Sequence, residues 1–292
     1  MTLKQIINAM TVDVEDYFHV SAFENSIDKA HWAKMPLRVE KNTYRLLELF
    51  EKHNVKSTFF TLGWVAERCP NLIKAIVDQG HEIASHGFAH QRITEMSTSD
   101  FIADVTKSKD ILEQLSGTEI VGYRAPSFSI NDSNTWVYEK LIELGFKYSS
   151  STYPIEHDLY GVPSWPRFIY ERSERFEGQK IIEIPIPTLR KNELNTGIGG
   201  GGYFRLYPYW LSKKRIDKFH QQEQQPYSFY FHPWEIDPEQ PRIKNAPLKS
   251  KFRHYINLSR MEGKLEKLMK DYQWDTMKSV YLDKNSQENG IS

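Results

Sequence analysis

The sequence predicts an α/β protein built on a parallel β-sheet, which is either open or, as we favour, closed into a barrel. Short β-like runs alternate with helical patterns along most of the chain, and a helix is predicted between most neighbouring strands. The length of 292 residues allows one large domain or two small ones, and α/β barrels of this size commonly form a single domain.

Seven short runs are predicted to form the strands. The first, Ile7–Val14, is mostly apolar, as expected of a buried strand. Short apolar runs bounded by polar or turn residues are typical of strands. The other six lie at residues 56–63, 81–87, 119–126, 146–151, 180–187 and 226–232.

Four helices are predicted between these strands. Residues 37–54 carry apolar side chains at helical spacing. The other three span residues 69–80, 97–117 and 131–145, and each ends at a glycine. Glycine is favoured just after the last turn of a helix, so these positions mark the helix ends.

The C-terminal third departs from this alternation. Residues 197–204, GIGGGGYF, are predicted to be a mobile or tightly turning loop. They lack the spacing and the Lys-Ser/Thr ending of a phosphate-binding loop, so they do not indicate nucleotide binding. After Gln240 a basic stretch precedes an amphipathic helix at residues 258–272. We expect this helix to pack back on the domain through Leu258, Met261, Leu265, Leu268 and Met269.

Composition limits the partners and the compartment. The 38 basic and 38 acidic side chains balance, so the total charge indicates neither a nucleic acid nor a membrane surface as partner. The single cysteine, Cys69, excludes an internal disulfide framework. The sequence shows neither a signal peptide nor a run of about 18 apolar residues. We therefore expect a soluble, cytoplasmic protein without a membrane span, and the sequence leaves its oligomeric state open.

Polar side chains that look out of place fall at the carboxyl ends of the predicted strands. In an α/β barrel that edge holds the active site, so their shared position predicts one functional site. Asp13 and Glu15 end the first strand, His86 and His90 follow the third, Arg124 ends the fourth and His232 ends the last.

His86 and His90, in the motif SHGFAH, are candidate ligands of an ion such as zinc. If the chain turned helical after the strand, both would project from one face. The pair alone is weak support, but the carboxylates strengthen it. In a strand Asp13 and Glu15 point the same way and Asp16 points the other way, unless the strand has already ended. A bound metal ion would compensate the charges of these carboxylates, and a carboxylate that is not a ligand could act as a base. The alternative interpretation of the cluster is an acidic turn that caps a helix and has no catalytic role.

Arg124 and His232 have two interpretations each. The guanidinium of Arg124, in GYRAPSFS, suits the orientation of a catalytic carboxylate, but it could equally form a structural ion pair. His232, in FYFHPWE, follows an apolar strand and is either a functional imidazole or a satisfied core residue. Aromatic residues in loop-like segments suit sugar stacking, although single aromatic residues more often pack a core.

Four motifs together resemble those of the polysaccharide deacetylase family, which is carbohydrate esterase family 4, with its Nod-factor-deacetylase-like domain. They are TVDVED, SHGFAH, YRAPSFS and FYFHPWE, in this order, and the resemblance covers about residues 8–241. The segments DVEDYF, GGGYFRLYPY and FHPWEIDPEQPR are similar to a bacterial subfamily found with exopolysaccharide and exosortase (PEP-CTERM) loci. That likeness extends the expected single domain to residues 1–282, with an extension at 242–282 and a disordered tail at 283–292.

The resemblance implies a distorted (β/α)7 barrel with a C-terminal helical extension, one divalent metal, usually zinc, and hydrolysis of the N-acetyl groups of amino sugars. The substrate would be an N-acetylated glycan or its lipid-linked precursor. Carried over position by position, Asp13 is the general base, Arg124 orients it and His232 is the general acid, while Glu15, His86 and His90 hold the metal. Pro126, Phe128, Tyr203 and Trp234 are the expected substrate-binding residues.

Two departures from the family pattern leave questions open. Many relatives have adjacent aspartates in the first motif, where this chain has Asp-Val-Glu-Asp, so Asp16 remains an alternative to Glu15 as the third ligand. Relatives often have Asp where Ser149 stands, and another residue must then contact Arg124 or tune the acid. Three rival functions also fit: a hydrolase of another amide, such as a deformylase or cyclic-amide hydrolase; a catalytically weak glycan-binding or assembly protein; and a structural metal barrel.

Overall fold

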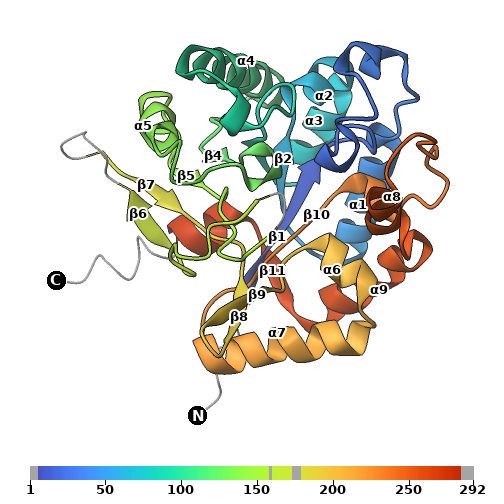
Figure 1. Cartoon of the computed structure of the whole chain (residues 1–292), viewed down its shortest axis with the longest axis vertical. Helices are drawn as coiled ribbons and strands as arrows, with labels where there is room; N and C mark the ends of the chain where they lie inside the picture. Colours follow the sequence, from blue (N-terminus) through green and yellow to red (C-terminus); the bar gives the residue numbers. More distant parts are fainter. Residues whose placement is uncertain (1–5, 158–159, 173–178, 284–292) are drawn as a thin grey trace.

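The computed structural model describes residues 6–157, 160–172 and 179–283 (Figure 1). At its centre seven parallel strands follow the order β10-β1-β2-β3-β4-β5-β7. Each of the seven predicted runs contains one of these strands. They span Ile7–Val14 (β1), Thr58–Thr61 (β2), Glu82–Ser85 (β3), Gly122–Tyr123 (β4), Tyr148–Ser149 (β5), Ile181–Glu183 (β7) and Ser228–Phe231 (β10). The predicted disordered tail lies, apart from Asp283, outside the described residues.

Four further strands are absent from the sequence prediction. β6 (Tyr170–Arg172) pairs antiparallel with β7, and β11 (Gln273–Asp275) pairs parallel with β1. β8 (Thr188–Lys191) and β9 (Leu194–Gly197) form a separate hairpin. These strands consist mostly of polar residues, so they lack the apolar run that marks the central strands.

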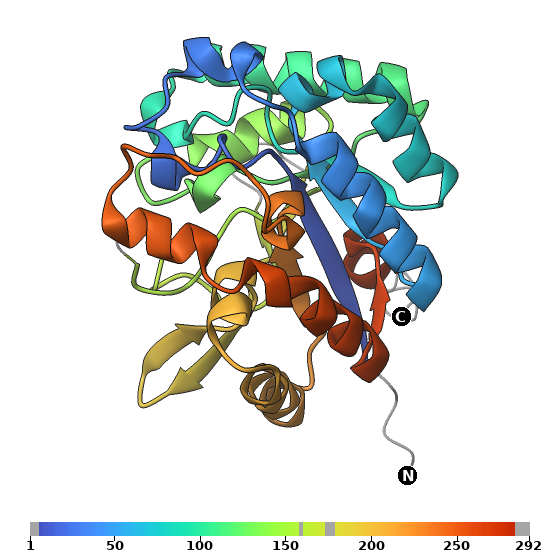
Figure 2. The same cartoon turned by 90° about the vertical axis from the view of Figure 1, so that its right-hand side faces the viewer.

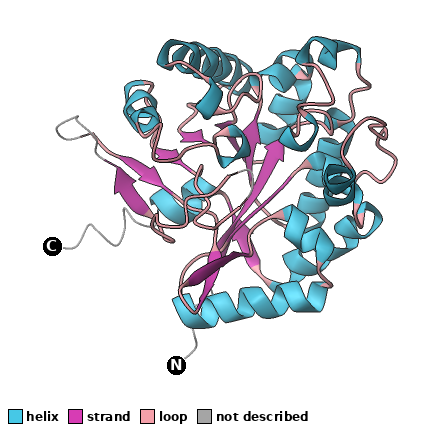
Figure 3. Cartoon of the chain, viewed as in Figure 1, coloured by secondary structure: helices cyan, strands magenta, loops and turns pink. Residues whose placement is uncertain are grey.

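Helices surround the central strands (Figure 3). The α-helices are α1 (Val39–His53), α2 (Gly63–Arg68), α3 (Pro70–Asp78), α4 (Thr98–Ser116), α5 (Trp136–Glu143), α6 (Gly201–Leu206), α7 (Tyr209–Glu223), α8 (Leu248–Tyr255) and α9 (Leu258–Asp271). Short 3-10 helices are η1 (Ser21–Phe23), η2 (Lys29–Lys34), η3 (Ile93–Glu95), η4 (Pro126–Phe128) and η5 (Pro233–Ile236), and η6 (Lys278–Asp283) is a π-helical turn. No helix in the described part of the chain combines the length and apolar character needed to cross a bilayer.

Side-chain alternation along β1 divides the core and places the first site residue. Met10, Val12 and Val14 belong to the large apolar cluster that includes residues of the surrounding helices. Ala9 belongs instead to a smaller cluster that faces the other side of the sheet. Because alternate residues of a strand share a face, Asp13 lies on the side of Ala9, at the carboxyl end of the strand. The other members of that cluster include Phe60, Ala84, Tyr148, Ile184, Met277 and Val280.

Helix α9 packs back on the domain, as predicted. The five apolar residues that line one side of α9 are all buried, and α9 contacts α1, α6 and β11. Figure 2 shows α8 and α9 following one another along one side of the molecule. The sequence of α9 is amphipathic because one face of the helix is buried against the domain.

The glycine-rich segment at residues 197–204 corrects a prediction, because it is not a loop throughout. Helix α6 begins inside it, at Gly201. A Cβ atom on Gly201 would lie 2.3 Å from Oε1 of Glu235, and one on Gly200 would lie 2.7 Å from the hydroxyl of Tyr230. The glycines therefore allow the start of α6 to pack directly against β10 and η5.

Candidate active site

The predicted base, acid and metal ligands line one cavity of about 200 Å³. It lies at the carboxyl ends of β1, β3, β4 and β10, which is the edge that the sequence predicts. Among the residues that line it are Asp13, Glu15, His86, His90 and His232. Arg124 lies beneath them, fully buried. The polar residues that the sequence places at strand ends therefore lie together in the structure.

Glu15, His86 and His90 form a group that could hold a metal ion. Their ligand atoms all lie within 4.8 Å of one another, and the three residues are buried. Oε2 of Glu15 lies 2.9 Å from Nε2 of His90 but accepts no hydrogen bond, and it is shielded from solvent. Two imidazoles and one carboxylate are a ligand set that suits zinc and similar divalent ions. The donor set and the unsatisfied oxygen therefore both fit a bound cation.

The histidines reach this position without a helical turn between them. No helix covers residues 86–92, and His90 has a left-handed backbone with φ of 47°. Such a conformation is uncommon for a residue other than glycine and is often found at functional sites. Nδ1 of His86 lies 2.9 Å from the carbonyl oxygen of Arg124, an arrangement that leaves Nε2 of His86 for a ligand. Burial lowers the pKa of His86 to about 4, so the imidazole is neutral, as a metal ligand must be.

Asp104 of α4 holds the backbone between the two histidines, and sequence reasoning missed it. Its carboxylate accepts hydrogen bonds from the backbone N–H groups of Phe88, at 2.7 Å, and Ala89, at 3.3 Å. Gly87, with φ of +74°, leaves room for this contact, since a Cβ there would lie 2.8 Å from Oδ2 of Asp104. In the sequence Asp104 looks like any acidic residue of an amphipathic helix.

Arg124 forms a buried ion pair with Asp13 and has several further partners. Nη1 of Arg124 donates to Oδ1 of Asp13, at 2.5 Å, and to the hydroxyl of Thr11, at 2.9 Å. Its Nε and Nη2 donate to the carbonyl and hydroxyl oxygens of Ser150, both at 3.1 Å. Ser149 donates instead to the hydroxyl of Ser151. Ser150 and Thr11 thus supply contacts to Arg124 in a chain that has no Asp at position 149.

His232 lies among three carboxylates. Its Nε2 lies 3.0 Å from Oε1 of Glu15 and 4.0 Å from Oδ2 of Asp13, while its Nδ1 lies 2.8 Å from Oε1 of Glu235. Burial lowers the pKa of His232, but Glu15 and Glu235 outweigh burial and raise this pKa to about 10. The arrangement therefore favours the imidazolium form.

Glu235, which sequence reasoning did not assign to the site, is itself fixed by a buried ion pair. Its Oε2 accepts from Nε of Arg205 at 2.6 Å, and both side chains are at most 2% exposed. Burial raises the pKa of Glu235, but Arg205 and His232 reverse the shift, and the pKa is lowered. The spacing His-x-x-Glu forms a capping box at the start of η5, and this spacing was the signal in the sequence.

Asp16 lies after the end of β1 at Val14, and its carboxylate contacts the start of α1 and not the histidines. Its carboxylate accepts hydrogen bonds from the backbone N–H groups of Tyr17, Arg38 and Val39, at 2.6 to 2.8 Å. Val39 is the first residue of α1, so Asp16 satisfies N–H groups at the start of that helix. Of the two alternatives, the geometry places only Glu15 beside His86 and His90.

The four expected substrate-binding residues are in different places. Phe128 and Trp234 line the cavity, and the ring of Trp234 stacks on that of His232 at 18° between planes. Tyr203 lines a neighbouring pocket of about 410 Å³. Pro126 is buried and is not among the described residues that line either cavity, so its assignment has no support from the geometry.

Two family models match most of the chain. Residues 30–148 match the family model described as polysaccharide deacetylase. This part of the chain is therefore related to the polysaccharide deacetylases. The match includes His86, His90 and Arg124, while Asp13 and Glu15 precede it. Residues 150–282, with His232, match a domain of unknown function, DUF3473.

Among curated proteins, part of the chain is similar to peptidoglycan deacetylases. It is 32% identical over 129 residues to a peptidoglycan deacetylase of Helicobacter pylori, over 43% of each chain. It is 36% identical over 75 residues to a peptidoglycan-N-acetylglucosamine deacetylase of Bacillus cereus, over 26% of this chain and 27% of the relative. The matched segment thus spans less than half the length of either relative.

Solved structures confirm the predicted fold class. A Mycobacterium smegmatis protein assigned to the polysaccharide deacetylases superposes with a TM-score of 0.64 at 19% identity, over 98% of this chain and 92% of that one. Puue allantoinase superposes with a TM-score of 0.59 at 18% identity, over 94% and 88%. These likenesses establish the distorted α/β barrel shared by such proteins.

Proposed function

We propose that the protein is a metal-dependent hydrolase that removes N-acetyl groups from the amino sugars of a polysaccharide or of its lipid-linked precursor. The observation that carries this proposal is the meeting of Asp13 and His232 with the group of Glu15, His86 and His90 in one cavity. The similarity of residues 30–148 to polysaccharide deacetylases supports the same reaction. The resemblance to exopolysaccharide-associated proteins favours an exopolysaccharide over peptidoglycan as substrate.

Glu15, His86 and His90 would hold the metal, and zinc fits these ligands best. A divalent ion there lowers the pKa of a water molecule and polarises the acyl carbonyl group. Although burial raises the pKa of Glu15, the neighbouring His90 and His232 hold it well below the usual range. Glu15 is therefore a carboxylate, the form that binds a cation.

Asp13 would act as the general base and His232 as the general acid. Arg124 occupies Oδ1 of Asp13, which leaves Oδ2, 4.0 Å from Nε2 of His232, to accept the proton of the attacking water. The hydroxyl of that water bonds to the acetyl carbon. Nε2 of His232 then gives its proton to the amide nitrogen as the C–N bond breaks, and the products are acetate and a free amino sugar. An amine leaves readily only when protonated, which is why the reaction needs His232 beside the base.

The first experiment measures metal content and acetate release on one purified sample. The substrates are N-acetylglucosamine oligomers and crude bacterial exopolysaccharide, before and after chelation. We expect acetate release that stops with the chelator and returns when zinc is added. Bound metal without acetate from any glycan would contradict the proposal, and assays with formylated and cyclic amides would then test the rival hydrolases.

Glu235→Gln should slow the hydrolysis of N-acetyl substrates more than that of activated aryl acetates. Glutamine can still accept from Nδ1 of His232, so the ring keeps its orientation, but the charge that favours the imidazolium is lost. General acid catalysis contributes about 10²–10⁴-fold, and we expect Glu235→Gln to remove part of it. The measurement is the ratio of kcat/KM for the two substrate classes.

The control is the same substitution in a His232→Ala background, where Glu235→Gln should have little further effect on that ratio. Equal losses on both substrate classes would show instead that Glu235 is a structural partner of Arg205.

A further inference from the structure

Helix α8 exposes apolar side chains at the surface of the molecule. Leu248 is 84% exposed and Phe252 is 60% exposed, and their spacing of four residues puts them on the same face of the helix. Leu206, at the end of α6, is 41% exposed and lines the pocket of about 410 Å³ together with Phe252. We call these three residues the apolar patch. Single exposed apolar residues are common, but a group of them typically marks an interaction site.

The packing of α8 keeps the apolar patch at the surface. The guanidinium of Arg205 holds the C-terminal end of the helix, because it donates to the carbonyl oxygens of three residues there at 2.8 to 3.0 Å. On the side of α8 that faces the domain, His254 is buried, and its ring stacks on that of Trp234 with 4.0 Å between ring centres. Because these contacts fix the helix, it cannot roll to bury the apolar patch.

The same segment has basic residues and no acidic ones. Residues 242–257 contain five Lys and Arg residues and neither Asp nor Glu, although the whole chain balances 38 basic against 38 acidic side chains. Four of the five are exposed, namely Arg242, Lys244, Lys249 and Arg253. A surface helix with apolar residues on one side and basic residues beside them is typical of helices that lie in the interface of an anionic bilayer.

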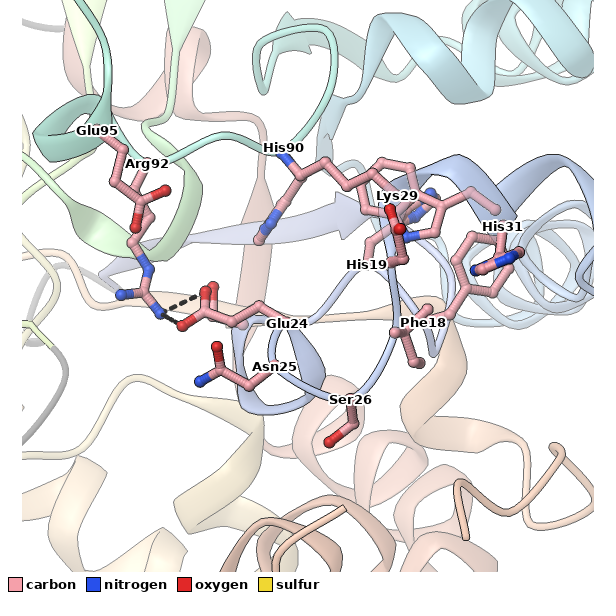
Figure 4. A pocket seen from close by; sticks show the side chains of 14 residues that line it. Phe18, His19, Glu24, Asn25, Ser26, Lys29, His31, His90, Arg92 and Glu95 are labelled. Atoms are coloured by element: carbon pink, nitrogen blue, oxygen red, sulfur yellow. Dashed lines mark hydrogen bonds and ion pairs between the residues drawn. The ribbon is translucent and has the colours of Figure 1, made fainter. Parts of the chain in front are cut away.

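The pocket beside His90 shows by comparison that this charge bias is local. That pocket, of about 720 Å³, is lined by acidic as well as basic side chains (Figure 4). The guanidinium of Arg92 donates to both carboxylate oxygens of Glu24, at 2.6 and 2.7 Å, as the dashed lines in Figure 4 show. Opposite charges that pair in this way attract an anionic surface little. The one-sided charge is therefore a feature of residues 242–257.

The apolar patch lies close to the mouth of the catalytic cavity. Gly202 and Arg253 line both that cavity and the pocket that Leu206 and Phe252 line. Figure 2 shows α6 and α8 on the same side of the molecule. A surface that contacts the apolar patch would therefore lie next to the catalytic cavity.

We propose that residues 242–257, together with Leu206, dock on the surface of an anionic lipid bilayer. Leu248 and Phe252 enter the layer beneath the headgroups, and the basic side chains contact the lipid phosphates. A nucleic acid would also complement the charge, but its phosphate backbone contacts charged and polar groups and gives the exposed Leu and Phe side chains no partner. The docking is independent of the proposed reaction. It favours the lipid-linked precursor over a free polysaccharide as substrate, and this last step alone rests on the proposed function.

The test is sedimentation of the whole protein with vesicles of phosphatidylcholine alone and with vesicles of equal parts phosphatidylcholine and phosphatidylglycerol. We expect the unaltered protein to bind the anionic vesicles at least about tenfold more tightly than the neutral ones, and added salt should weaken this binding. The double variant Leu248→Ser/Phe252→Ser should bind the anionic vesicles at least about tenfold more weakly, because its apolar contact with the bilayer is lost. Lys244→Glu should weaken binding at least about fivefold, which is the contribution of one basic residue near such a surface.

The matched controls change the same residue types at other exposed positions. Leu194→Ser replaces a leucine of the β8–β9 hairpin, and Lys214→Glu replaces a lysine of α7. Both controls should bind the anionic vesicles like the unaltered protein. Because every substituted position is exposed, all the variants should unfold at the same urea concentration.

The outcomes separate this inference from the proposed reaction. If no glycan yields acetate but the preference for anionic vesicles is found and the double variant loses it, the reaction is wrong and the docking stands. If the unaltered protein does not bind anionic vesicles, or if the double variant binds them like Leu194→Ser, the docking is overturned. Gel shift with duplex DNA and light scattering test the other occupants. DNA binding, or a dimer that the double variant dissociates, in the absence of vesicle binding would assign the surface to a nucleic acid or to a second copy of the chain.

Discussion

Replacing Asp13 with asparagine should lower acetate release by about 10²–10⁴-fold without loss of bound metal, the range expected when a general base is removed. The amide oxygen of asparagine can still accept the hydrogen bond from Nη1 of Arg124, but its NH₂ group cannot take a proton from water. Because asparagine has nearly the same shape as aspartate, the variant should also keep the shape of the cavity. Acetate release and metal content, measured on the same sample, test whether Asp13 is the general base.

Two further variants make this result interpretable. Asp110→Asn changes an exposed aspartate on α4 and should leave turnover and metal content as they are. Asp13→Ala leaves the fully buried Arg124 without its carboxylate and should reduce the free energy of unfolding by about 3–5 kcal/mol, measured in urea. If Asp13→Asn kept more than a tenth of the activity, Asp13 would be a structural partner of Arg124 and the base would lie elsewhere.

The central strands were predictable because their signal is local. Each of the seven runs is bounded by polar or turn residues, and β1 has the predicted bounds, Ile7–Val14. Helix α6 was not predictable, because its glycines resemble a loop when read without Tyr230 and Glu235, the side chains against which they pack. Propensity describes a residue in isolation, and here tertiary contact overrides it.

The sequence predicted which residues form the site. It did not predict which other residues hold those side chains in place. Strand ends that meet at one edge placed Asp13, His86 and His232 together without any knowledge of distances. The residues that position the site could not be recognised in the sequence. Asp104, which binds the backbone between His86 and His90, is distant in sequence, and Ser150, which binds Arg124, is one of four consecutive Ser and Thr residues. Pairing through space leaves no periodic trace in a sequence.

Glu15→Gln should release the metal, whereas Asp16→Asn should retain it and destabilise the fold. Glu15 lies with His86 and His90, and loss of its charge removes one of three ligands. Loss of a residue that only supports a ligand typically weakens metal binding by about 10–100-fold, so loss of a ligand should exceed that range. Metal content after dialysis against a weak chelator measures the difference between the two variants.

Asp16→Asn is the matched control because the two carboxylates are adjacent and equally buried. Both oxygens of Asp16 accept from backbone N–H groups, and an amide would turn a donor toward at least one of them. We expect a loss of about 1–3 kcal/mol in the free energy of unfolding, measured in urea, with metal content unchanged. The reverse pattern, metal lost from Asp16→Asn and kept by Glu15→Gln, would move the ligand to Asp16 and require the chain after β1 to turn when the ion binds.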